Sequence, residues 1–78
     1  MPDQEGKVFR KTEIVGTSTV GWDDAGKRAI ARAMKTLRNV SWFEVKEHRG
    51  RIIGSADNFQ LEFQVTLEIG FLLEDPHR

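Results

Sequence analysis

The chain has 78 residues, no cysteine, two histidines far apart in the sequence, and twelve basic against twelve acidic side chains, so its formal net charge is zero. The absence of cysteine excludes disulfides, and the two histidines have no spacing that suits a metal site. The balanced charge argues against a nucleic-acid partner. No apolar run approaches the ~20 residues of a membrane span. We expect a single cytoplasmic domain, residues 1–78. A domain of this size buries only roughly 60 % of the surface that its unfolded chain exposes, so we also expect it to gain further burial by self-association.

The first part of the chain predicts a polar tail and then a strand. Residues 1–6 are polar, and we expect them to be frayed, like residues 75–78 at the other end. From Lys7 to Val15, β-forming side chains are interleaved with charged ones, which is typical of a strand at or near a sheet edge. The segment Gly16-Thr17-Ser18-Thr19 should end this strand, and its hydroxyl groups offer caps for a helix.

A helix is predicted from about Thr19 or Trp22 to Arg38, because apolar residues recur there with a period of 3.6. The centre of its apolar stripe consists of small residues, namely Gly26, Ala29 and Ala33. Such a helix can approach a sheet closely. Asp23 and Asp24 fall in its first turn, where they suit the helix dipole; we prefer this interpretation to a pair of catalytic carboxylates.

A second strand is predicted from Val40 to about Ile53. Phe43 and Val45 have one parity and Trp42 the other, and the apolar alternation lapses after Val45. We therefore expect this strand to extend beyond the core or to contain a bulge near Gly50.

A third strand is predicted from Asn58 to Leu73, where apolar and polar residues alternate strictly. At roughly 3.3 Å per residue this strand would span about 45 to 50 Å. The resulting fold class is α+β, a β-α-β-β chain whose three-stranded antiparallel sheet wraps around one helix, with the last two strands as a hairpin. A helix from 22 to 38 would be about 25 Å long, so it can shield only about half of the last strand, and the remainder should meet a neighbouring subunit.

Trp42 and Gln64 are candidate binding residues on the sheet face away from the helix. Parity places Trp42 there with Glu44, Lys46 and His48, either as an aromatic platform for a planar ring or as filling of a subunit interface. Gln64 lies on the paired strand, and its amide offers a donor and an acceptor side by side, which suits the edge of a pyrimidine-like ring. The alternative for Gln64 is a solvent-facing side chain.

The segment Arg49-Gly50-Arg51, with Lys46 and His48 nearby, forms the densest basic cluster outside the helix. Its guanidinium groups can bind phosphate or form ion pairs with glutamates of a neighbouring subunit. The sequence has no cysteine or tyrosine, no phosphate-binding loop and no recognisable nucleophile motif, and we interpret Ser18 as a cap. We therefore expect no catalytic residues and no enzyme activity.

Five segments taken together carry a family resemblance: Glu13-Ile14-Val15-Gly16-Thr17-Ser18, Ala33-x-Lys35-Thr36-Leu37-Arg38, Trp42-Phe43-Glu44-Val45, Arg49-Gly50-Arg51 and Phe63-Gln64-Val65-Thr66-Leu67-Glu68-Ile69-Gly70-Phe71. Their order and spacing, from about Lys7 to Glu74, resemble the dodecins. The resemblance implies β-α-β-β subunits that assemble into a hollow homododecamer and bind flavins at subunit interfaces, with no established catalytic turnover. It thereby implies flavin storage, sequestration or photoprotection.

The resemblance also implies roles for single residues. Trp42 corresponds to the tryptophan that stacks on the isoalloxazine, Gln64 to the glutamine that hydrogen-bonds to its pyrimidine edge, and Arg49 to a basic position near the flavin phosphate, which favours FMN over riboflavin. Leu72 stands where many bacterial members have an arginine, so a coenzyme A site is open to question. The hairpin loop is longer than in many relatives, and its geometry is not carried over.

Two other functions fit the same residues. An oligomeric interaction scaffold without a ligand would use Trp42 as interface filling. A small RNA-binding module would use Trp42 as a platform for bases and Arg49 and Arg51 for phosphates. Titration with flavin and with RNA distinguishes these alternatives.

Overall fold

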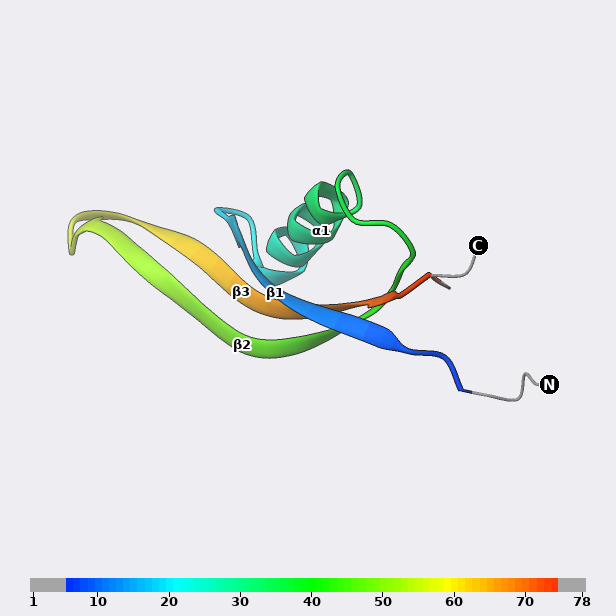
Figure 1. Ribbon diagram of the computed structural model, residues 1–78. Helices are drawn as coiled ribbons and strands as arrows, with labels where there is room; N and C mark the ends of the chain where they lie inside the picture. Colours follow the sequence, from blue (N-terminus) through cyan, green and yellow to red (C-terminus); the bar gives the residue numbers. More distant parts are fainter. Residues whose placement is uncertain (1–5, 75–78) are drawn as a thin grey trace.

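The computed structural model describes residues 6–74 and shows one helix packed on one face of a three-stranded sheet (Figure 1). Strand β1 spans Phe9–Ser18, helix α1 Trp22–Ala33, strand β2 Val40–Ser55 and strand β3 Asn58–Leu72. The predicted α+β class and β-α-β-β order are confirmed. The prediction of frayed tails, residues 1–6 and 75–78, lies outside the described residues except for Gly6.

The strand order is β1-β3-β2, and both neighbouring pairs are antiparallel. The long third strand is therefore central, and β2 and β3 form the predicted hairpin. Gly54 lies just before the hairpin turn with φ 112, and a Cβ there would overlap the carbonyl oxygen of Asn58, so this position requires glycine. In Figure 1 the long strands curve toward the side of the helix, and the end of the hairpin extends past α1.

The core lies between α1 and β3. Its buried apolar residues are Ala25, Ala29, Ala33, Val65, Leu67 and Ile69. Because the residues of the helix are small, α1 sits close to the sheet, as the sequence predicted. In β1, a Cβ on Gly16 would overlap the carbonyl oxygen of Ala25 and lie 2.8 Å from the Cβ of Ala29, so this glycine permits the close approach.

The helix is shorter than predicted, because it ends at Ala33 and not at Arg38. After Ala33 two hydrogen bonds join residues three apart, as in a tighter turn. The Lys35 N–H donates to the Arg32 carbonyl at 3.2 Å, and the Thr36 N–H donates to the Ala33 carbonyl at 3.1 Å. Asn39 then takes a left-handed conformation with φ 62, which ends the turn. A helix of 12 residues is about 18 Å long, so it covers even less of β3 than expected.

The strand bounds and the bulges of β2 also differ from the prediction. β1 continues to Ser18 and β2 to Ser55. The register of β2 shifts between Val40 and Trp42 and again between Val45 and Glu47. Of the two expectations for this strand, the extension beyond the core is therefore confirmed and the bulge near Gly50 is wrong. The second bulge adds one residue and reverses the parity of β2 beyond it.

This reversal corrects the predicted position of His48. His48 is the register partner of the buried Val65, so it lies on the helix side of the sheet and not beside Trp42. Arg49 becomes the partner of Gln64. We call the sheet surface that faces away from α1 the outer face; it includes Trp42, Gln64 and Arg49.

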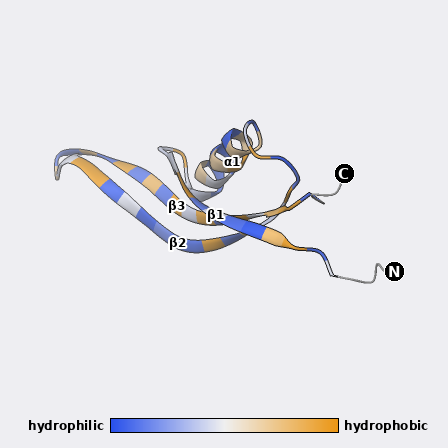
Figure 2. Cartoon of the chain, viewed as in Figure 1, coloured by the Kyte–Doolittle hydropathy of each residue, from blue (hydrophilic) through white to orange (hydrophobic). Residues whose placement is uncertain are grey.

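Much apolar surface remains uncovered, as we predicted from the difference in length between the helix and the last strand. Ile52 and Phe59, near the end of the hairpin, are 73 % and 56 % exposed. Figure 2 shows the hydrophobic and hydrophilic bands that alternate along this free part of the hairpin. The radius of gyration is 17.0 Å, whereas a compact domain of this length has about 11.5 Å. Within residues 6–74 no helix is both long and apolar enough to cross a membrane.

Candidate functional site

Two rows of the outer face contain the three predicted site residues. In one row Trp42 of β2 lies opposite Gly70 of β3, and in the other Arg49 lies opposite Gln64. The rows are six residues apart along β3, about 20 Å in an extended strand. Trp42 therefore lies apart from the pair of Arg49 and Gln64 within one chain. A planar ligand reaches both rows only if it lies lengthwise between them or if a second chain supplies one of them.

Trp42 lies across β3 at Gly70. A Cβ on Gly70 would overlap the six-membered ring of the indole, so the missing side chain provides the space that the ring occupies. Phe9 of β1 packs beside it, with ring centroids 6.3 Å apart and the planes at 58°. Trp42 remains 39 % exposed. The structure thus holds an indole against the sheet from one side while leaving part of it open for a planar partner.

The second row is formed by Gln64 and Arg49, and Arg51 lies next to it, opposite Glu62. The Gln64 Nε2 donates to Oε1 of Glu62 at 3.1 Å, and Nε of Arg51 donates to the same oxygen at 3.2 Å. Arg51 therefore has a carboxylate partner in its own chain. Within residues 6–74 no ion pair involves the Arg49 side chain. Of the two arginines, Arg49 is the one available for an external anion.

A cluster of charges separates the two rows. Nζ of Lys11 lies 2.9 Å from Oε1 of Glu68 and 3.7 Å from Oε1 of Glu44, and Nζ of Lys46 lies 3.9 Å from the Glu68 oxygen. The hydrogen bond from the Lys11 ammonium lowers the pKa of Glu68, and the positive charge of Lys11 adds a smaller effect in the same direction. The sequence did not indicate this cluster, because it depends on the register that aligns Glu44, Glu68 and Glu13 across the sheet.

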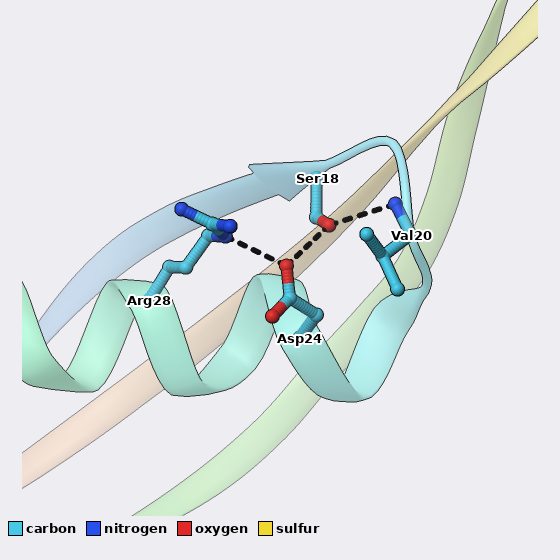
Figure 3. A network of polar contacts seen from close by, with 4 residues as sticks. All are labelled: Ser18, Val20, Asp24 and Arg28. Atoms are coloured by element: carbon cyan, nitrogen blue, oxygen red, sulfur yellow. Dashed lines mark hydrogen bonds and ion pairs between the residues drawn. The ribbon is translucent and has the colours of Figure 1, made fainter.

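Ser18, Asp24 and Arg28 form a network at the start of α1 (Figure 3). The Ser18 hydroxyl donates to Oδ2 of Asp24 at 2.6 Å and accepts the Val20 N–H at 2.9 Å, and Nε of Arg28 donates to the same Asp24 oxygen at 2.6 Å. The N-cap is Gly21, with no side-chain hydrogen bond, so the prediction that Ser18 caps the helix is wrong. Ser18 ties β1 to α1, and Asp24 has a structural role.

This network should make the fold sensitive to acid. Hydrogen bonds from Arg28 and Ser18 lower the pKa of Asp24 below its usual value of 3.8. Because the pKa is lower in the folded state, the stabilisation is complete above about pH 5 and is lost as the pH falls to the folded pKa. Asp24→Asn should be destabilised at neutral pH and should lose less stability than the parent between about pH 5 and pH 2.

Thermal melts across this pH range measure the effect. Asp23→Asn is the matched control, because it removes the neighbouring first-turn carboxylate and leaves the network intact. We expect the control to keep the acid dependence of the parent. An Asp24→Asn profile parallel to that of the parent would contradict the role of the network.

These features define a class: a small β-α-β-β protein whose sheet extends beyond its helix and presents an indole on the outer face. The family model described as Dodecin matches residues 8–74. A dodecin of Thermus thermophilus is 56% identical over 70 residues, covering 90% of this chain and 97% of the relative. The crystal structure of the tt0972 protein from Thermus thermophilus matches with a TM-score of 0.79 and 56% identity, covering 90% of this chain and 98% of that one.

A more distant structure agrees. Dodecin from Streptomyces coelicolor matches with a TM-score of 0.77 and 41% identity, covering 91% of this chain and 97% of that one. The chain belongs to the dodecin family.

Proposed function

We propose that the protein binds a flavin noncovalently in a hollow homododecamer, for flavin storage, sequestration or photoprotection in the cytoplasm. The observation that carries the proposal is the indole of Trp42, fitted over Gly70 and open on the outer face of a dodecin-family chain. Arg49 and Gln64 lie on the same face. The proposal assigns no catalytic step to the protein.

The shape of the chain supports self-association. The molecule measures 65 × 20 × 14 Å, and apolar side chains of β2 and β3 remain exposed on the helix side as well as on the hairpin. Phe43 and Val45 are among them, because α1 packs mainly on β1 and β3. A subunit of this size gains stability by burying such surface against copies of itself.

The side chains of the outer face match the parts of a flavin when two chains each supply one of the two rows. The isoalloxazine is planar and stacks on an open indole, which contributes roughly 0.5–1.5 kcal/mol beyond area burial. The Gln64 amide can pair with the pyrimidine edge once its Nε2 gives up the hydrogen bond to Glu62 and donates to the ligand instead. The Oε1 of Gln64 is an acceptor for the same edge. The Arg49 guanidinium suits a phosphate, so we propose FMN rather than riboflavin as the preferred flavin.

Coenzyme A is a second ligand that the family resemblance allows. Leu72, where many bacterial members have an arginine, is the register partner of Phe9 at the end of β3. The side chain at this position supplies no charge for a phosphate. We therefore propose coenzyme A only as a secondary ligand, to be tested by adding it to the flavin titration.

Titration of FMN into flavin-free protein tests the proposed function. Stacking on Trp42 brings an electron-rich ring into contact with the excited flavin, so the flavin emission should fall until the sites are saturated. Unchanged emission together with an oligomeric protein would favour a scaffold without ligand. RNA binding that weakens steeply with salt would favour the nucleic-acid alternative.

Gln64 should contribute to affinity separately from stacking. Gln64→Ala removes one donor and one acceptor, at about 0.5–1.5 kcal/mol per hydrogen bond, so losing both should lower affinity about fivefold or more. The flavin that still binds should remain quenched, because the indole is unchanged. Gln60→Ala, on the same strand and face but nearer the hairpin end, is the matched control and should bind like the parent. If both variants bind alike, Gln64 does not recognise the ring edge.

A further inference from the structure

Trp22, the first residue of α1, contacts the β2–β3 hairpin from the helix side of the sheet. Its indole Nε1 donates a hydrogen bond of 2.9 Å to the carbonyl oxygen of Arg49. The ring also meets two aromatic side chains edge-on: His48 at 5.5 Å and 87°, and Phe63 at 4.9 Å and 75°. One side chain of the helix thus contacts both strands of the hairpin.

Of the three partners of Trp22, Arg49 belongs to the second row of the outer face and the other two adjoin it. His48 directly precedes Arg49 in β2, and Phe63 directly precedes Gln64 in β3. Adjacent residues of a strand point to opposite faces. A contact that fixes the backbone from the helix side therefore sets the position from which the next side chain extends on the outer face.

Trp22 contributes little to the core. Its side chain is 41 % exposed, whereas the contact of α1 with the sheet is made by buried alanines. The helix packs mainly on β1 and β3, so Trp22 provides its specific contact with the edge strand β2. The position of this contact, at Arg49, lies just beyond the register shift between Val45 and Glu47, where the ladder of β2 is irregular.

We infer that Trp22 is a positioning residue of the flavin site, which holds Arg49 in place and thereby sets the preference for FMN over riboflavin. The inference rests on the proposed function, in which Arg49 binds the flavin phosphate. Without the hydrogen bond from the Trp22 indole to the Arg49 carbonyl, the backbone of Arg49 is free to move and its guanidinium is less well ordered. The loss concerns the phosphate contact and leaves stacking on Trp42 unchanged.

Trp22→Phe tests the inference, because it keeps an aromatic ring and removes the N–H donor. We expect the affinity for FMN to fall about two- to tenfold, the size of one lost hydrogen bond, while the affinity for riboflavin changes less than the affinity for FMN. The ratio of the two affinities is the decisive readout, since a general loss of folding or assembly would weaken both ligands equally. An unchanged ratio overturns the inference.

A double-mutant cycle identifies the residue through which Trp22 acts. Arg49→Met should lower the preference for FMN, and Trp22→Phe added to it should lower the ratio no further. A further loss in the double variant, or an unchanged ratio in Arg49→Met alone, overturns the inference. If Trp22→Phe does not assemble, Phe63→Leu removes an edge contact of the indole; it should lower the same ratio, and an unchanged ratio counts against the role of Trp22.

The parent protein separates this result from a failure of the proposed function. If the parent binds neither FMN nor riboflavin, the proposed function fails. If the parent binds and quenches both flavins and the ratio survives Trp22→Phe, only the positioning role fails.

Discussion

Replacing Trp42 by alanine should reduce flavin affinity more than tenfold and remove most of the quenching of bound flavin. The variant loses about 1 kcal/mol of specific stacking together with the apolar area that the ligand buries on the indole. The chain should still fold, because Trp42 is not part of the core between α1 and β3. Fluorescence titration with FMN measures affinity and quenching in the same experiment.

Trp42→Phe is the control for this prediction. It keeps an aromatic face over Gly70 but replaces the indole with a poorer electron donor, so affinity should lie between those of the parent and of Trp42→Ala and quenching should be weaker. If Trp42→Ala assembles normally and binds and quenches flavin like the parent, the site lies elsewhere, and the role implied by the family is wrong for this chain.

Gly70→Ala should impair flavin binding almost as strongly, although the proposed site assigns no ligand contact to position 70. The new Cβ would occupy the space of the indole ring, lying 2.7 Å from its Cδ2 and nearer to two other ring atoms. Overpacking in a closed core costs about 1–3 kcal/mol. Here the ring is half-exposed and can swing outward, so stability should change little while the platform for the flavin is lost.

A melt and a flavin titration on the same variant test this separation. Gly26→Ala is the matched control: its Cβ would lie 3.9 Å from Cγ1 of Val65, an ordinary contact, in the interior of α1. Alanine is favoured over glycine in a helix by about 1 kcal/mol, so the control should be more stable and should bind flavin like the parent. Parent-like flavin binding by Gly70→Ala would show that the indole does not need its place over position 70.

The sequence predicted those parts of the fold that depend on periodicity. The strict alternation from Asn58 to Leu73 predicted β3, which spans Asn58–Leu72, and the small residues at the centre of the helix predicted a close helix–sheet contact. The end of α1 was placed too late because Leu37 continues the helical period and packs against the core from the turn that follows the helix. Periodicity alone does not distinguish a last helical turn from a tightened one.

The sheet face on which the candidate residues lie was predicted, but their arrangement along that face was not. Trp42 and Gln64 lie on the outer face as predicted. The shift between Val45 and Glu47 is a property of strand pairing that composition does not reveal; it moves His48 to the helix side and aligns Arg49 with Gln64. The contact of Trp22 with the hairpin was also missed, because from the sequence this tryptophan was interpreted only as a possible first residue of the helix.

Sedimentation of the protein with FMN, followed at a wavelength that only flavin absorbs, tests the central claim most directly. Twelve chains of 8.9 kDa give a particle of about 107 kDa. We expect flavin absorbance and protein to move together in one boundary of this mass at micromolar concentration. A folded monomer, or an oligomer that sediments while the flavin stays behind, would contradict the proposal that this chain forms a flavin-binding shell.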